Sequence, residues 1–163
     1  MISNISIIGW FHTIVSLAAM IIALYALLRY KIFNFCNISS KTYLLLTFLA
    51  GASALFIYNN GGFNIAHLLA LATIIFVLAG LYIEIKKLFG RWSIYFYTSA
   101  YTSTLLFHLV PGLTEVLQRF PADSPKVVGF EPVLFEYYKI LFLIYAFILI
   151  VQLIWIRVYK LDV

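Results

Sequence analysis

Charged residues are scarce in this chain, and their scarcity excludes a soluble fold. They make up 10% of the 163 residues while hydrophobic residues make up 64%, whereas a soluble domain has about 25% and roughly 45–50%. A soluble fold of this length cannot remove so much apolar surface from water. The composition therefore predicts a single integral membrane domain over residues 1–163.

Several groups that carry common chemistries are also missing. The single cysteine, Cys36, excludes an intramolecular disulfide. The sequence contains no glycine-rich phosphate loop with its lysine and no GxSxG nucleophile elbow. The net charge of +5 does not indicate nucleic acid, because the basic residues lie in short connectors rather than in one stripe.

Long apolar runs predict an all-α bundle of five transmembrane helices, since a helix of about 20 apolar residues crosses a bilayer. We expect these spans at residues 5–30, 41–58, 65–86, 92–111 and 133–159. The second is short, so four spans are the alternative. Residues 112–132 are expected on the outer surface, as a short amphipathic helix or a bent extension of the fourth span, followed by a turn-rich loop.

The basic residues predict the orientation of the chain. With five spans, most Lys and Arg residues fall on one side: Arg29, Lys31, Lys41, Lys86, Lys87, Arg91, Arg157 and Lys160. Positive residues mark the cytoplasm, so we expect the N-terminus outside and the C-terminus inside. No basic residue precedes the first apolar run, which predicts a retained span rather than a cleaved signal peptide.

All three histidines lie inside predicted spans, where ionisable residues are costly and are candidates for function. His12, His67 and His108 each lie near the outer end of a span, so we expect all three in the outer third of the bilayer. Tyr101 and Thr104 precede His108 at helical spacing. A polar stripe of this kind is expected to face the bundle rather than lipid.

Three imidazoles at one depth predict a metal or haem site. Neutral imidazole binds Zn, Cu and Fe, and two histidines on facing helices can hold a haem b. The expected ligands are His12, His67, His108 and Glu115, with Tyr101 and Thr104 orienting them. The alternative is that each histidine only hydrogen-bonds a carbonyl or a water and that no cofactor binds. Glu84 lies three residues before Lys87, and this spacing predicts a local ion pair between the two side chains.

The stretch from Ala52 to Thr73 contains His67, and His12 is followed by small residues and the basic connector at residues 29–31. In these features the first three spans resemble an uncharacterised family of predicted bacterial integral membrane proteins, a domain of unknown function. Family members tend to carry further histidines, which are missing here at residues 37–42 and 91–92. The resemblance implies a bacterial inner-membrane location and attention to His12 and His67, and it implies no reaction.

These observations leave three functions open, and they do not decide whether the protein is an enzyme. The first is a small inner-membrane protein that holds haem b or a transition metal, with electron transfer to or from quinone. The second is a non-catalytic membrane subunit or assembly factor whose polar stripe docks a partner. The third is a small transporter, although the sequence shows no inverted repeat of the kind that many carriers have.

Overall fold

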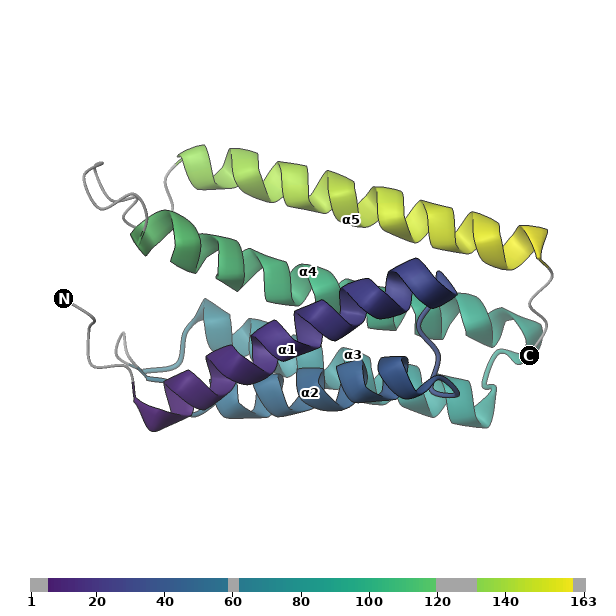
Figure 1. The fold of residues 1–163 in the computed structure, drawn as a ribbon, viewed down its shortest axis with the longest axis horizontal. Helices are drawn as coiled ribbons and strands as arrows, with labels where there is room; N and C mark the ends of the chain where they lie inside the picture. The colour runs from purple at the N-terminus through teal and green to yellow at the C-terminus, as the bar shows by residue number, and fades with distance from the viewer. Residues whose placement is uncertain (1–5, 59–61, 120–131, 160–163) are drawn as a thin grey trace.

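The computed structural model describes residues 6–58, 62–119 and 132–159, and this part of the chain is all-α with no strand. Figure 1 shows helices that run along one common long axis. Their bounds are α1 (Ile7–Tyr30), α2 (Ile38–Ala54), α3 (Ile65–Lys86), the 3₁₀ turn η1 (Gly90–Trp92), α4 (Ser93–Arg119) and α5 (Pro132–Val158). The all-helical architecture expected from the sequence is confirmed for these residues.

The first four helices form a ring, and α5 lies outside it. Helix α2 packs between α1 and α3, α4 packs against α3 and more lightly against α1, and α5 packs against α4. Helices α2 and α4 therefore face each other across the ring (Figure 1). The α1–α2 connector, the α3–α4 connector and the end of α5 lie at the same end of the bundle.

Small residues allow the helices of the ring to approach closely. Ala19, Ala23 and Ala26 of α1 are fully buried, and small side chains at such positions bring helix backbones together in a membrane. On α3, Gly80 lies directly against the ring of Tyr101. A Cβ atom at Gly80 would lie 2.5 Å from Tyr101 Cε1. The position of the Tyr101 side chain in the ring thus depends on a glycine on the neighbouring helix.

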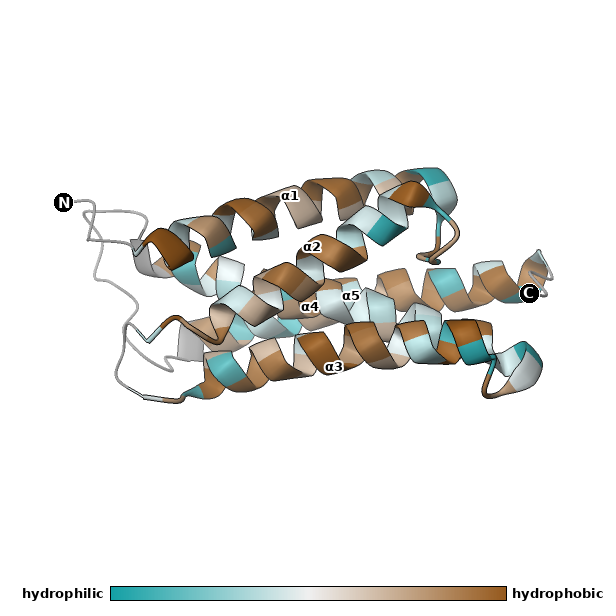
Figure 2. Cartoon of the chain, turned by 90° about the horizontal axis from the view of Figure 1, so that it is seen from below, coloured by the Kyte–Doolittle hydropathy of each residue, from teal (hydrophilic) through white to brown (hydrophobic). Residues whose placement is uncertain are grey.

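Among the described residues, three of the five α-helices are long and apolar enough to cross a membrane: Ile7–Tyr30, Ile65–Lys86 and Leu134–Val158. The sequence predicted five. Helix α2 is only 17 residues long, and α4, although it has 27 residues, carries many Thr, Ser and Tyr side chains. Figure 2 shows more polar residues along α2 than along the middle of α3. The structure thus supports a membrane protein but not five spans by length and composition.

Helix α4 continues beyond the expected end of the fourth span. It runs through Pro111 to Arg119 without a break in the helix, so the beginning of segment 112–132 extends α4 rather than forming a separate helix. Pro111 removes one backbone hydrogen bond, and the Thr114 hydroxyl donates to the Val110 carbonyl at 2.8 Å in the same turn. The turn-rich loop expected next falls at residues 120–131, outside the described residues.

Candidate polar axis of the bundle

Helix α2 buries a polar face along most of its length. Ser40, Tyr43 and Thr47 are fully buried, and Ser53 is nearly so. Ser40, Tyr43 and Thr47 are three and four positions apart, so they share one side of the helix, and Ser53 lies about a third of a turn away from that side. A polar face is expensive to bury unless its groups find hydrogen-bond partners. Ser40 Oγ has no hydrogen-bond partner among the described residues, so the partners of Tyr43, Thr47 and Ser53 show what the face is used for.

Helix α4 presents a second polar face toward the centre of the ring. Tyr97, Tyr101 and Thr104 are buried, and His108 is partly buried on the same side. The inward orientation expected for Tyr101, Thr104 and His108 is thereby confirmed. Their expected role as supports of a metal or haem ligand is a separate matter and stays a prediction.

The two polar faces meet between α2 and α4. The Tyr43 hydroxyl lies 2.5 Å from Thr104 Oγ1, and His108 Nε2 lies 3.2 Å from Thr47 Oγ1. Thr47 lies four residues after Tyr43 on α2, so the two contacts are neighbours on one side of this helix. Because α2 and α4 lie on opposite sides of the ring, these contacts run along its centre. We call the connected groups on this line the polar axis.

His12 joins the polar axis from α1 at one end. Its Nδ1 lies 3.0 Å from the Ala50 carbonyl oxygen and 3.3 Å from Ser53 Oγ. A carbonyl oxygen only accepts hydrogen bonds, so Nδ1 of His12 carries a hydrogen and donates it. Ala50 is one turn beyond Thr47, the residue that His108 contacts, and the two imidazoles are close enough to interact electrostatically.

Glu84 forms the other end of the polar axis. The Tyr101 hydroxyl donates to Glu84 Oε2 at 2.8 Å, and the Phe35 backbone N–H donates to Glu84 Oε1 at 2.7 Å. The ion pair expected between Glu84 and Lys87 is not the contact that this carboxylate makes. Tyr101 also links the two ends, because its carbonyl accepts the Thr104 hydroxyl at 2.6 Å. The axis thus extends from His12 on α1 to Glu84 near the end of α3.

His67 lies apart from the polar axis. It is buried at the start of α3, where its Nδ1 accepts the Asn64 N–H at 3.2 Å and completes a capping box. Its ring packs between Tyr58 and Phe63, with centroid distances of 4.9 and 5.1 Å. This histidine stabilises the beginning of a helix, so its contacts are those of a structural residue.

The predicted three-histidine site is not assembled in the described part of the chain. No group of three His, Cys, Asp or Glu side chains there lies close enough to hold one metal ion. His12 and His108 both contact α2, whereas His67 serves the cap of α3. Glu115 lies on an exposed part of α4. The three histidines were expected at the same depth in the bilayer, but their imidazoles do not meet at one point.

The sequence analysis missed the residues of α2 and the role of Glu84. A signal was present, because Ser40, Tyr43 and Thr47 repeat at helical spacing within an apolar run. It was weak, since single hydroxyls are common in transmembrane helices. The Glu84 contacts could not be read from the sequence, because Phe35 and Tyr101 are 49 and 17 residues away.

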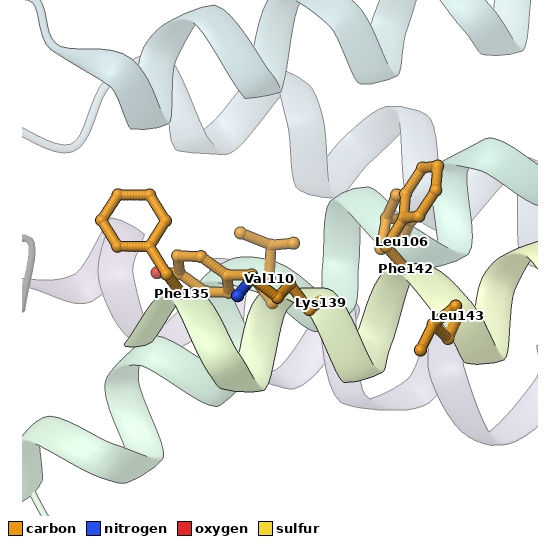
Figure 3. A pocket seen from close by; sticks show the side chains of 7 residues that line it. Leu106, Val110, Phe135, Lys139, Phe142 and Leu143 are labelled. Carbon is orange, nitrogen blue, oxygen red and sulfur yellow. The ribbon is translucent and has the colours of Figure 1, made fainter. Parts of the chain in front are cut away.

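A second feature is an apolar groove of about 610 Å³ between α4 and α5. Figure 3 shows Leu106, Val110, Phe135 and Phe142 along it. The charged residue of its lining, Lys139, is held by Glu136 on the same helix at 2.7 Å. The lining of the groove therefore does not place two reactive or ligand-binding side chains next to each other.

No protein family, no curated protein and no solved structure matches this chain.

Proposed function

We propose that this chain is a small transporter of protons, which moves them across the bacterial inner membrane along the polar axis. The observation that carries the proposal is the series of buried hydroxyl groups and partly buried ionisable groups between His12 and Glu84, supplied by four helices of the ring. Ionisable residues inside membrane helices mark ion pathways and proton relays. A small bundle that needed only stability would fill its centre with apolar side chains at lower cost.

The chemistry of the axis suits protons. Tyr and Thr hydroxyls both donate and accept hydrogen bonds, so a proton can enter on one side of such a group and leave on the other. His12 donates through Nδ1 to a carbonyl, which in the neutral ring leaves Nε2 as a proton acceptor. Glu84 receives the Tyr101 hydroxyl at the opposite end. Bridging waters would complete the path where no direct hydrogen bond joins neighbouring groups, as between the two histidines and between the hydroxyls of Tyr43 and Tyr101.

A path across the membrane requires that α2 and α4 also span it, and we include five spans in the proposal. At about 1.5 Å per residue, the 17 residues of α2 extend roughly 26 Å, close to the hydrocarbon thickness of about 30 Å. Their polar faces point into the ring, so lipid meets the apolar sides. The basic residues at 29–41 and 86–91 gather at one end of the bundle, which favours the N-terminus outside and the C-terminus inside.

The docking alternative receives less support from the same geometry. A stripe that docks a partner must be accessible, yet Tyr101 and Thr104 are fully buried by the chain's own helices. Their hydroxyl groups already bond Glu84, Tyr43 and a backbone carbonyl. The stripe therefore serves the interior of this bundle.

Haem b or a metal ion at the histidines, with electron transfer to quinone, stays a prediction from the sequence. The visible spectrum and metal content of the purified protein distinguish it from proton transfer. A Soret band or one metal ion per chain that is lost in His12→Ala and His108→Ala would favour a cofactor. Proton transfer by the polar axis requires neither signal.

Proteoliposomes give the direct test of proton transfer. The purified protein is reconstituted with a pH-sensitive dye inside the vesicles, and a potassium gradient with valinomycin supplies the driving voltage. We expect a voltage-dependent proton flux that empty vesicles lack. Tyr43→Phe and Glu84→Gln should each lower the flux about tenfold, because each removes one hydrogen-bonding step from the path.

Tyr145→Phe is the matched control for Tyr43→Phe. Its hydroxyl bonds Ser103 at 2.9 Å on the side of α4 that faces α5, away from the polar axis, so the flux should be unchanged. A wild-type flux no greater than that of empty vesicles would overturn the proposal. Equal losses in Tyr43→Phe and Tyr145→Phe would show that the axis is not the path.

A further inference from the structure

The connector between α1 and α2 folds back into the bundle at the Glu84 end of the polar axis. It covers residues 31–37, and within it Ile32 and Phe33 are buried. The Phe33 ring stacks on Tyr43, with centroids 4.7 Å apart. Tyr43 is a member of the axis, so the connector contacts the path itself. A connector that merely joined two helices would expose such residues to solvent or lipid headgroups.

Two hydrogen bonds from other helices hold the connector in place. The Phe35 N–H donates to Glu84 of α3 at 2.7 Å, and the Lys31 carbonyl accepts from Gln152 Nε2 of α5 at 2.9 Å. Gln152 is buried, and its Oε1 accepts the Thr102 hydroxyl of α4 at 2.6 Å. The amide of Gln152 therefore spans from α4 to the connector.

We propose that residues 31–37 form a lid over the cytoplasmic end of the polar axis, and that the lid opens when Glu84 takes up a proton. This inference rests on the proposed function, since the proton that reaches Glu84 through Tyr101 is the one that opens the lid. A carboxylate is a stronger hydrogen-bond acceptor than a neutral carboxyl. Protonation of Glu84 thus weakens its bond from the Phe35 N–H and frees the connector.

One charged group near Glu84 opposes opening of the lid. Among the described residues, the titratable groups facing this carboxylate are Lys41 of α2 and the phenols Tyr97 and Tyr101 of α4, and Cys36 of the connector lies near Tyr97. The Lys41 ammonium attracts the carboxylate and also lies 5.1 Å from the centroid of the Phe35 ring. This attraction favours the charged Glu84, and with it the closed connector, against the cost of burying the carboxylate, which favours the protonated form.

Hydrogen exchange of the full-length protein in lipid nanodiscs tests the lid through the peptide that contains Phe35. Gln152→Leu removes the second tie without touching Glu84, and we expect exchange in residues 31–37 to become about tenfold faster. Ser103→Ala is the matched control, because it also removes a hydrogen bond between α4 and α5 but leaves the connector alone. Unchanged exchange in Gln152→Leu would overturn the lid.

Glu84→Gln provides a second variant if Gln152→Leu does not fold. In the wild type, exchange of the Phe35 peptide should rise as pH falls, after correction for intrinsic chemistry. In Glu84→Gln the exchange rate of this peptide should be high at every pH, because the neutral amide never becomes the carboxylate that holds the Phe35 N–H. A corrected exchange rate that does not depend on pH in the wild type contradicts the proposal.

Flux measurements separate failure of the lid from failure of proton transfer. A lid predicts that Gln152→Leu raises the wild-type proton flux several-fold, since the closed connector opposes passage. If exchange rises and the flux stays at the wild-type value, the connector is not a lid and the polar axis still conducts. If the wild type shows no flux, the proposed function fails, and the lid over a proton path fails with it.

Discussion

A histidine ring has two nitrogens, and the partner of one decides what the other can do. In His12, Nδ1 donates to the Ala50 carbonyl at 3.0 Å, so the lone pair of the neutral ring sits on Nε2. In His67, Nδ1 lies 3.2 Å from the Asn64 backbone nitrogen and 3.0 Å from Asn64 Oδ1, so this nitrogen serves the helix cap in either tautomer. The same residue type at the same expected depth therefore has a proton-accepting position in one case and a structural position in the other.

The single substitutions His67→Ala and His108→Ala should have different effects, the first on stability and the second on proton transport. His67→Ala removes half of a capping box and the stacking between Tyr58 and Phe63, which should lower the free energy of unfolding by about 1–3 kcal/mol. His108→Ala should instead lower the proton flux about tenfold, because it removes a group bonded to Thr47. Denaturant titration and vesicle flux measure the two effects.

The two variants serve as controls for each other in the same assays. His67→Ala protein that folds should carry the wild-type flux. A loss of flux in His67→Ala as large as in His108→Ala would place His67 on the path, and the assignment of His67 to the cap alone would be wrong.

At the scale of the helix, the polar side of α4 was predictable and that of α2 was not. The repeated Tyr, Thr and His of α4 stand out, and burial confirms that they face inward. In α2 the polar side chains have a similar spacing, but they lie inside a run of Leu and Phe, where a single hydroxyl is weak evidence for a polar face. The contact of Tyr43 with Thr104 joins residues 61 positions apart, and such pairings depend on how the helices are arranged in space.

A glycine on α3 sets the position of Tyr101, and Gly80→Ala should show it. The added Cβ would lie 2.5 Å from Tyr101 Cε1, so the ring must move, and overpacking of this kind costs about 1–3 kcal/mol. The shift also displaces the Tyr101 hydroxyl from Glu84, so we expect both stability and proton flux to fall. Thermal unfolding in detergent and the vesicle assay measure these losses.

Gly112→Ala is the control for Gly80→Ala. Gly112 also lies in a helix, but a Cβ there meets nothing within 4 Å. The alanine should therefore stabilise α4 by roughly 0.5–1 kcal/mol and leave the flux unchanged. Equal destabilisation by both substitutions would mean that loss of glycine in general, rather than contact with Tyr101, is the cause.

For the whole molecule, composition determined the class of fold and left the arrangement open. The 64% of hydrophobic residues and the helix-length runs predicted an all-helical membrane protein, and a helix is present in each of the five runs, although α4 extends to Arg119 and α2 ends at Ala54. The ring of α1–α4 with α5 outside depends on close contacts such as Gly51 against Ile74. Such contacts join different helices, and hydropathy along the chain contains no information about them.

Orientation is a property of the whole chain, and reporter fusions in a bacterial host test it. With basic residues concentrated at the end that holds the α1–α2 connector and the end of α5, we expect that end in the cytoplasm. Green fluorescent protein fused to the C-terminus should fluoresce, because it folds there in the cytoplasm. Alkaline phosphatase inserted after residue 123 should be active, because five spans place that segment outside.

The two reporters exchanged between these sites are the control, and both should then be inactive. A phosphatase-active C-terminus would reverse the orientation and would place Glu84 and the connector at residues 31–37 on the outer side of the membrane. The lid would then cover the outer mouth of the polar axis. Activity of both reporters at one site would instead show that the chain inserts in two orientations, because the bias of its Lys and Arg residues is too weak to select one.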